Sequence, residues 1–302
     1  KHRQRCCGMQ IEECALVLEG GGMRGAFTAG IIDYLLQNEI YFEEVIGVSA
    51  GANNGANYCS RQRIRNKKIF TELVEDKRYM GIKNLIKNGS YFGMDFLFHQ
   101  LPHEILPFDY QSFRESSSML KVAVTECSSG EVRYFTPQNF AEISKIDKVF
   151  KASSSLPLVS KAVEIEDKYY LDGGIRDSIP VQKAIADGFK NLVVILTREN
   201  GYRKTPVKAD FLLDLFLRKY PNLVDDLKAR HKVYNNTLDL IAEKEKAGEF
   251  FVFRPKELEI DRFSKDPEQL EDLFDSGFKL AQEKSKELDE WLQNLKSIEM
   301  NY

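Results

Sequence analysis

Short apolar runs alternate with helix-like segments along the first two thirds of the chain. Continuous apolar runs of strand length occupy residues 15–19, 45–48, 121–127 and 191–197. Apolar residues spaced three and four positions apart predict helices over residues 23–37, 143–153 and 180–187. Strands that are apolar throughout, with helices between them, are typical of a parallel sheet covered on both faces. The pattern therefore predicts an α/β fold with a mostly parallel central sheet.

The pattern changes after residue 197. A polar stretch leads to predicted helices over residues 210–220, 222–246 and 267–295, with one strand over residues 249–254. We therefore divide the chain into three parts. Residues 1–10 are a tail that is disordered or foreign to the natural protein, residues 11–200 form the main domain, and residues 201–302 form a mainly helical extension packed on it.

Composition places the protein among soluble globular chains. Of its 302 residues, 43% are hydrophobic and 29% are charged, which excludes the collagen-like and disordered classes. The formal net charge of −3 argues against a nucleic-acid partner, because such proteins usually carry a basic excess. The sequence has no apolar run of the roughly 18 residues that a membrane span needs. We expect a cytoplasmic protein; peripheral contact with a membrane and the oligomeric state stay open.

The cysteines predict neither a disulfide framework nor a metal site. Their number is odd, and no two of them have the CxxC spacing of a zinc site: Cys6, Cys7, Cys14, Cys59 and Cys127. Free thiols in a reducing compartment are the expected state. The acidic residues show no calcium-binding pattern either. We expect no metal ion and no cofactor.

A glycine-rich loop lies between the first predicted strand and the first predicted helix. Its sequence is Gly20-Gly21-Gly22-Met23-Arg24-Gly25. At the start of a helix, such a loop presents free backbone N–H groups to an anion. The anion is either a pyrophosphate, as in the GxGxxG fingerprint of dinucleotide-binding proteins, or the oxyanion of an acyl-transfer reaction. In the dinucleotide alternative, Glu39, Glu43 or Glu44 would bind the ribose.

A second glycine-marked turn contains a serine. The sequence Gly47-Val48-Ser49-Ala50-Gly51 fits GxSxG and begins within a predicted strand. In a nucleophile elbow, this sequence raises the serine on a sharp turn between strand and helix, and the small residues at Gly47 and Gly51 relieve the crowding. The positive end of the following helix favours the negative charge that develops during attack. Ser49 is therefore the predicted nucleophile.

A base must take the proton from Ser49, and histidines are scarce. Only His231 follows in the chain order Ser-Asp-His, and its charged neighbours predict a solvated helix face. Asp172 ends a predicted strand and begins the turn Asp172-Gly173-Gly174. We therefore expect Asp172 to act directly as the base. A Ser49–Asp172–His231 triad that cleaves small esters is the alternative.

One aromatic segment has two interpretations. Residues 91–98 contain four aromatic side chains, and Leu101, Phe108 and Phe113 follow shortly afterwards. The segment either packs in the core, as such apolar clusters usually do, or has a function, in which case it lines a pocket for an acyl chain or forms a flap against lipid.

These three turns, in this order, resemble those of the patatin-like phospholipases. The similarity covers about residues 14–200, including the stretch 151–157 before Asp172, and the tail looks like that of a bacterial subgroup. The resemblance implies a three-layer α/β/α fold and a Ser–Asp dyad that cleaves ester bonds of lipids. By motif position, Ser49 would be the nucleophile and Asp172 the base. The backbone from Gly20 to Gly25 would form the oxyanion hole with Arg24 near its mouth, and Glu19 receives no role.

The expected function is therefore that of a serine acyl hydrolase. It would release fatty acid from a phospholipid or another acyl ester, as an enzyme of the phospholipase A or lysophospholipase type, and no cofactor takes part. Besides the triad and the dinucleotide-binding alternative, a protein that keeps the fold but only binds lipid stays open.

Overall fold

One mixed sheet forms the centre of the molecule. The computed structural model describes residues 9–207, 213 and 217–299. Within these residues the sheet has eight strands in the order β5-β6-β3-β2-β1-β7-β8, with β4 paired to β3. The strands are β1 (Met9–Leu18), β2 (Ile40–Val48), β3 (Met119–Glu126), β4 (Val132–Phe135), β5 (Val163–Ile165), β6 (Lys168–Asp172), β7 (Asn191–Ile195) and β8 (Phe250–Phe253). The pairs among β3, β2, β1, β7 and β8 are parallel, whereas β4, β5 and β6 pair antiparallel.

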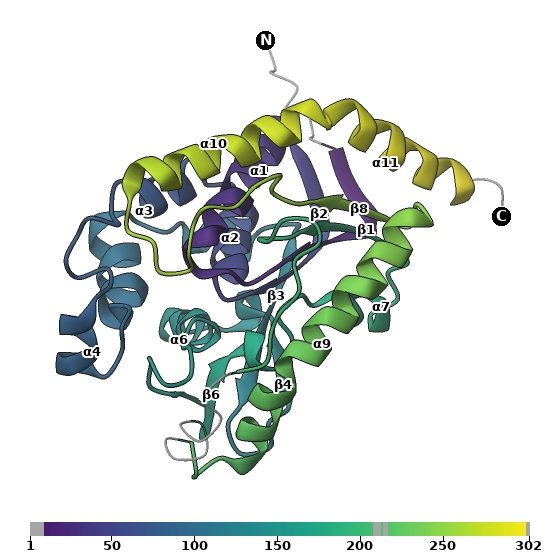
Figure 1. Cartoon of the computed structure of the whole chain (residues 1–302). Coiled ribbons are helices and arrows are strands. Elements are labelled where there is room, and N and C mark those ends of the chain that lie inside the picture. Colours follow the sequence, from purple (N-terminus) through teal and green to yellow (C-terminus); the bar gives the residue numbers. More distant parts are fainter. Residues whose placement is uncertain (1–8, 208–212, 214–216, 300–302) are drawn as a thin grey trace.

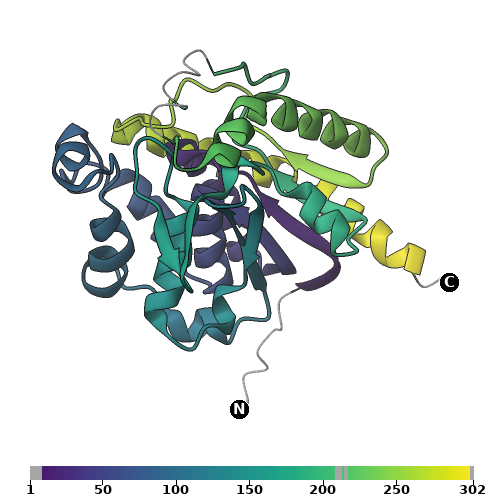
Figure 2. The same cartoon turned by 90° about the horizontal axis from the view of Figure 1, so that it is seen from below.

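Helices cover both faces of this sheet (Figures 1 and 2). One face carries α1 (Gly25–Gln37), α2 (Ala50–Cys59), α6 (Ile143–Ser153) and α10 (Pro267–Glu283), and the other carries α7 (Val181–Ala186) and α9 (Pro221–Lys246). Strand β1 shows how the sequence encodes this arrangement. Leu16 and Leu18 face one core, and Ala15 and Val17 face the other. Because both faces of the strand are buried from Cys14 to Leu18, this part of the strand is apolar throughout. The expected three-layer α/β/α fold is confirmed.

Four shorter helical segments lie between α2 and β3, and a final helix ends the described chain. They are α3 (Arg65–Thr71), α4 (Ile82–Asn88), the π-helical segment η2 (Phe96–Ile105), α5 (Tyr110–Arg114) and α11 (Ser285–Glu299). In Figure 1, α3 and α4 lie to one side of the sheet.

The three sequence motifs meet at one edge of the sheet. Leu18, at the end of β1, pairs with Gly47 near the end of β2. Val48 pairs with Ala123 of β3, and the next residue of β3, Val124, pairs with Asp172. Because β1 and β2 run parallel, their carboxyl ends lie side by side, and the antiparallel β6 brings its own last residue to the same place. The glycine loop, Ser49 and Asp172 thus follow from neighbouring strand ends.

The C-terminal part of the chain joins the fold in two ways. Strand β8 extends the sheet by pairing in parallel with β7. Helix α10, yellow in Figure 1, lies alongside α1, and their backbones approach closely at two glycines. A Cβ atom on Gly30 would lie 1.9 Å from the carbonyl oxygen of Phe274, and one on Gly277 would lie 2.2 Å from that of Phe27. Only a residue without a side chain permits this contact.

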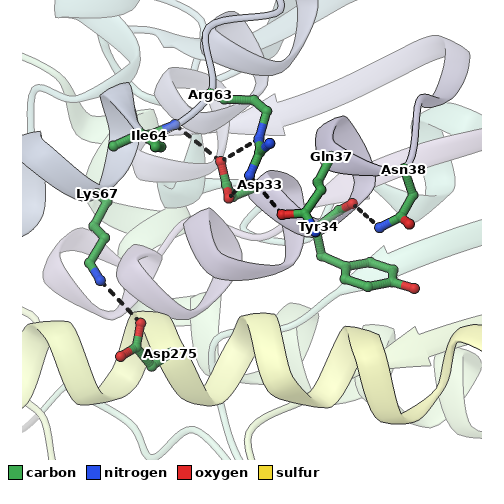
Figure 3. Close-up of polar contacts among 8 residues, drawn as sticks. All are labelled: Asp33, Tyr34, Gln37, Asn38, Arg63, Ile64, Lys67 and Asp275. Carbon is green, nitrogen blue, oxygen red and sulfur yellow. Dashed lines mark hydrogen bonds and ion pairs between the residues drawn. The ribbon is translucent and has the colours of Figure 1, made fainter.

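A polar network ties α1 to α3 and α10 (Figure 3). Asp33 on α1 accepts a hydrogen bond from the backbone N–H of Ile64 at 3.1 Å and forms an ion pair with Arg63 at 3.0 Å. Lys67 on α3 pairs with Asp275 on α10 at 3.2 Å. The Asp33 side chain is buried, so its two partners satisfy a carboxylate that has left water. This network fixes the position of α3 against the main core.

Two predicted elements differ from the structure, and a third lies mostly outside the described residues. The helix expected over residues 267–295 is two helices that meet at Lys284. The sequence did not predict this break because the apolar stripe continues beyond it through the buried Leu288 and Leu292. Strand β1 begins at Met9, so the last two residues of the expected tail belong to the sheet. Most of the helix expected over residues 210–220 lies outside the described residues.

The described part of the chain lacks two features of membrane and metal proteins. No helix there is both long enough and apolar enough to span a bilayer. Likewise, no cluster of three His, Cys, Asp or Glu side chains in this part could hold a metal ion. Three cysteines, Cys14, Cys59 and Cys127, are buried free thiols.

Candidate active site

Ser49 stands on a strained turn between β2 and α2. Its backbone has φ 53° and ψ −123°, a conformation that residues with a side chain rarely adopt. Its backbone N–H donates to Ser153 Oγ at 2.9 Å. The turn is tight: a Cβ on Gly47 would lie 2.8 Å from the backbone nitrogen of Ala52, and one on Gly51 would lie 2.5 Å from Leu18 O. The geometry is that of a nucleophile elbow, as the GxSxG sequence predicts.

Asp172 is held at the end of β6 by its backbone and one carboxylate oxygen. Its N–H donates to Ser155 O at 2.9 Å, and its Oδ1 accepts from the N–H of Gly174 at 2.7 Å. The residue is only 2% exposed. Among the described residues, Oδ2 has no hydrogen-bond partner, although the Ser49 hydroxyl is near enough to favour the charged carboxylate. In an unliganded enzyme, such a hydrogen bond is often long and shortens only when substrate binds.

Burial raises the pKa of Asp172 above its ordinary value of 3.8. The Ser49 hydroxyl and the Gly174 N–H lower this pKa, and the positive charges of Arg230 and Arg262 act in the same direction. Burial is the largest of these effects. A carboxylate with a raised pKa is a stronger base than one in water, provided that it is ionised at the working pH.

The glycine loop lies beside Ser49, but only part of its backbone is free. A Cβ on Gly20 would lie 3.3 Å from Ser49 Cβ. The N–H of Gly20 donates to Ser178 O at 3.2 Å, and that of Met23 donates to Arg262 O at 3.1 Å. In the described part of the chain, the N–H groups of Gly21 and Gly22 have no acceptor. Gly22 has φ +59°, and a Cβ there would lie 2.6 Å from Arg262 O.

The remaining predicted site residues have different surroundings. The N–H of Gly25 donates to the carbonyls of Gly22 and Met23. Arg24 is 8% exposed, and its Nε has no hydrogen-bond partner among the described residues. Gly173 and Gly174 begin the short helix η4 (Gly173–Ile175) after Asp172.

Glu19, to which the sequence assigned no role, positions the loop. It is 1% exposed and is the last residue before the glycines. Its Oε2 accepts from the N–H of Thr197 at 2.5 Å, and its Oε1 accepts from Tyr234 Oη at 2.6 Å. A buried carboxylate with both oxygens bonded is held firmly. Glu19 thereby connects the loop to the end of β7 and to α9.

The three serines at residues 153–155 also support the site. The sequence indicates them only as part of the stretch 151–157 that resembles the family. Ser153 Oγ accepts from Ser49 N and donates to Ala123 O at 2.7 Å. Ser154 Oγ accepts from Asn53 on α2 at 3.0 Å, and Ser155 O accepts from Asp172 N. The end of α6 therefore holds both the predicted nucleophile and the predicted base.

His231 lies in the same cavity as Ser49 and Asp172 but is bonded elsewhere. Its Nδ1 lies 2.9 Å from the carbonyl oxygen of Lys228 on its own helix. No hydrogen bond in the described part of the chain joins His231 to Ser49 or Asp172. The contacts of a Ser–Asp–His triad are absent from this arrangement.

Two cavities of opposite character meet at Ser49. The first has a volume of about 150 Å³, and much of its wall comes from the aromatic segment and its neighbours, including Phe92, Leu97, Phe98, Leu101 and Phe108. The second, of about 360 Å³, is polar and contains Asp172. Gly22, Ser49 and Leu156 line both. The aromatic segment therefore lines a cavity, while Phe113 packs in the core.

Comparison with known proteins gives the family. The sequence profile of the patatin-like phospholipases matches residues 16–185, which is more than half of the chain. The chain belongs to the patatin-like phospholipase family. A second profile, a domain of unknown function (DUF6363), matches residues 220–293.

Two curated proteins are similar to this patatin-like chain. It is 31% identical over 198 residues to the uncharacterized protein YjjU of Escherichia coli (strain K12), covering 64% of this chain and 54% of that protein. It is 23% identical over 192 residues to the probable lipid hydrolase 463L of Invertebrate iridescent virus 6, covering 56% of this chain and 62% of that protein. The chain thus spans less than two thirds of the length of either relative.

A solved structure shares the fold of this patatin-like chain. The crystal structure of VipD from Legionella pneumophila matches with a TM-score of 0.52 and 14% identity, covering 93% of this chain and 67% of that one. At this identity the likeness concerns the fold alone.

The dinucleotide-binding alternative does not fit this patatin-like fold. Glu43 and Glu44 lie within β2, and Glu39 precedes it. Ser49 follows the other end of the same strand, beside the glycine loop. A ribose-binding acid must lie near that loop, at the carboxyl ends of the strands. The three glutamates are therefore in the wrong place to bind a nucleotide held by Gly20 to Gly25.

Proposed function

We propose that this protein is a serine hydrolase of lipid acyl esters that uses Ser49 as nucleophile and Asp172 as base. The observation that carries the proposal is the position of Ser49. It stands on a strained elbow beside a buried carboxylate, at the mouth of an apolar cavity. The family and the name of the viral relative support a lipid ester as substrate.

The geometry supports a two-step reaction. Asp172 accepts the proton of Ser49 Oγ while the oxygen attacks the ester carbonyl, and the proton then passes to the departing alcohol. Water enters, gives one proton to Asp172 and attacks the acyl-enzyme. As the bond to Ser49 Oγ breaks and the fatty acid leaves, Asp172 returns the proton to Ser49 Oγ. The apolar cavity beside Ser49 is the expected place for the acyl chain during both steps.

Gly21 and Gly22 are the proposed oxyanion donors. Their N–H groups are free of backbone acceptors in the described residues, whereas those of Gly20, Met23 and Gly25 are already bonded. The positive end of α2 begins at Ser49 and adds to the stabilisation. Loss of one oxyanion donor in an enzyme of this kind raises the barrier by about 2.7–4 kcal/mol.

Labelling of the intact protein with a fluorophosphonate tests the nucleophile. The expected result is a single adduct by mass spectrometry in the wild type, its loss in Ser49→Ala, and its retention in Ser129→Ala, which removes an exposed serine outside both cavities. Hydrolysis of a medium-chain p-nitrophenyl ester should likewise be lost in Ser49→Ala and kept in Ser129→Ala. An adduct that persists in a folded Ser49→Ala would refute the assignment.

A comparison of Asp172→Asn with His231→Ala tests the base. Asparagine has nearly the shape of aspartate but cannot accept the proton, so Asp172→Asn should be almost as inactive as Ser49→Ala. Because His231 is bonded to its own helix, His231→Ala should keep turnover within a few-fold of wild type. If His231→Ala folds but loses activity as completely as Ser49→Ala, the base works through a triad, whose members act as a unit.

A further inference from the structure

The apolar cavity beside Ser49 extends along two helices that both have one end at the nucleophile. Helix α2 begins after Ser49 and lines the cavity with Asn53 and Asn57 on successive turns. Helix α6 ends at Ser153, which binds Ser49, and it lines the cavity with Asp147 further back. At a rise of 1.5 Å per residue, Asn57 lies about 12 Å from Ser49 along α2, and Asp147 lies about 9 Å from Ser153 along α6. The cavity therefore runs from Ser49 toward Asn57 and Asp147.

Hydrogen bonds between four elements close this far end. Arg65 on α3 donates through Nη1 to Asn57 Oδ1 and through Nη2 to Leu106 O, both at 2.9 Å. Tyr110 on α5 donates through its hydroxyl to Asp147 Oδ1 at 2.5 Å. The segment from Leu106 to Tyr110 thus connects the α2 side of the cavity with the α6 side. Four of these residues line the cavity, and we call them the closed end: Asn57, Arg65, Tyr110 and Asp147.

The closed end is polar, and its groups already have partners. Asn57 is 2% exposed and Arg65 is 8% exposed. Burial lowers the pKa of Arg65 to about 10, and the nearby Tyr110 acts in the opposite direction. A methyl group that advanced past this point would separate a buried guanidinium from its acceptors, which is unfavourable. The wall that is apolar beside Phe98 and Leu101 therefore ends in a barrier to an apolar chain.

The size of the cavity limits the chain to a similar length. Its volume is about 150 Å³. An engineered protein cavity of about this volume holds benzene, which has about six carbon atoms. The distance along α2 agrees: about 12 Å less a contact distance of about 4 Å leaves about 8 Å, which an extended chain with bonds of about 1.5 Å fills with roughly six methylenes.

We propose that the closed end limits the acyl group, so that the preferred substrates are esters of medium-chain acids with about six to ten carbon atoms. This inference rests on the proposed hydrolase function and adds the class of acyl group. Arg65 and Tyr110 determine the specificity, because they are the side chains that a longer chain would meet. An apolar groove without an end has the opposite preference, since each added methylene tightens binding about fourfold.

Two esters that differ only in chain length provide the test. The ratio of kcat/KM for p-nitrophenyl tetradecanoate to that for p-nitrophenyl octanoate, at equal mole fraction in the same detergent micelles, should be below about one tenth in the wild type. Tyr110→Ala and Arg65→Ala should each raise this ratio at least about tenfold, because each opens the closed end. Tyr110 is half-buried, so its variant should fold even if Arg65→Ala does not.

Tyr134 provides a matched control. Its hydroxyl donates to Asp177 Oδ2 at 2.5 Å, as that of Tyr110 does to Asp147, but Tyr134 lines neither cavity. Tyr134→Ala loses the same ring and the same kind of bond, so it should keep the wild-type ratio. A wild-type ratio near or above one would overturn the inference. A low ratio that a folded Tyr110→Ala leaves unchanged, or that Tyr134→Ala raises equally, would also overturn it.

Binding of the free acids decides the length limit without hydrolysis. Calorimetry on Ser49→Ala should show that tetradecanoate binds no more tightly than octanoate, both below their critical micelle concentrations. Adding Tyr110→Ala to this variant should tighten the binding of tetradecanoate at least about tenfold. Tetradecanoate that binds to Ser49→Ala about a thousandfold more tightly than octanoate, as six further methylenes predict, would overturn the inference. If neither ester is hydrolysed in a Ser49-dependent manner while the acids still show the limit, the hydrolase function fails and the closed end stands.

Discussion

The strained backbone of Ser49 predicts that this residue lowers the stability of the fold. At φ 53° and ψ −123°, a Cβ atom is crowded against the backbone, whereas glycine has no Cβ. We therefore expect Ser49→Gly to be more stable than Ser49→Ala, although both lack the hydroxyl and both should be inactive. In an ordinary position the order is reversed, because glycine loses more backbone entropy on folding than alanine.

The magnitude follows from two opposing effects. A residue held in such a sparsely populated region raises the energy of the folded state by about 1–3 kcal/mol. Glycine in place of alanine lowers stability by about 0.4–1 kcal/mol through the unfolded chain. The midpoints of these two ranges predict that Ser49→Gly exceeds Ser49→Ala by roughly 1.3 kcal/mol in free energy of unfolding.

Urea unfolding of the two variants measures this difference, and Ser60 provides the control. Ser60 caps the other end of α2 with an unstrained φ of −77°. Ser60→Gly and Ser60→Ala lose the same hydroxyl, so here the alanine variant should be the more stable by about 0.5–1 kcal/mol. If Ser49→Gly is less stable than Ser49→Ala by a similar amount, the elbow stores no strain and the reasoning is wrong.

Two further predictions concern Asp172 and the contact between α1 and α10. Burial raises the pKa of Asp172 in the folded state above its value of about 3.9 in the unfolded chain. The folded protein is therefore most stable, with respect to this group, below about pH 3.9, where Asp172 is protonated in both states. This stability is lost as the pH rises through the folded pKa. Asp172→Asn should therefore gain stability over the wild type between about pH 4 and neutral pH, and urea titrations that show a constant difference would contradict this. Gly30→Ala would place a Cβ 1.9 Å from Phe274 O and should lower the free energy of unfolding by about 1–3 kcal/mol or more. Gly55→Ala, whose Cβ would meet a movable Leu120 methyl at 2.9 Å, should have a smaller effect, and equal losses would refute the packing argument.

Much of the fold could be predicted from the sequence because buried strands leave a clear signal. Strands β1, β2, β3 and β7 each contain a run of successive buried apolar residues, so these runs stand out without knowledge of their neighbours. The antiparallel strands β4 to β6 carry exposed positions and produce no such run. The break at Lys284 was invisible because the apolar stripe continues across it.

The site was only partly predictable for a related reason. Ser49 and Asp172 belong to local motifs, whose spacing depends on a single turn. Arg230 and Glu19 act through contacts with residues far away in the chain, and a single sequence carries no record of which distant residues meet. The closed end of the apolar cavity is likewise a property of the fold, because separate helices bring its residues together. The serines at residues 153–155 are a weak sequence signal for the contacts that they make with Ser49 and Asp172.

The contacts of the glycine loop determine when a growing chain can acquire its active site. Tyr234, which binds Glu19, lies 215 residues further along the chain, and the Arg262 carbonyl that binds Met23 lies further still. At ribosomal rates of about 5–20 residues per second, Ser49 precedes these partners by on the order of ten to fifty seconds. During that time the loop beside Ser49 lacks the groups that fix its shape. A chain synthesised only a little beyond Ser49 therefore lacks these contacts, and the proposed hydrolase activity would begin only after residue 262 has been made.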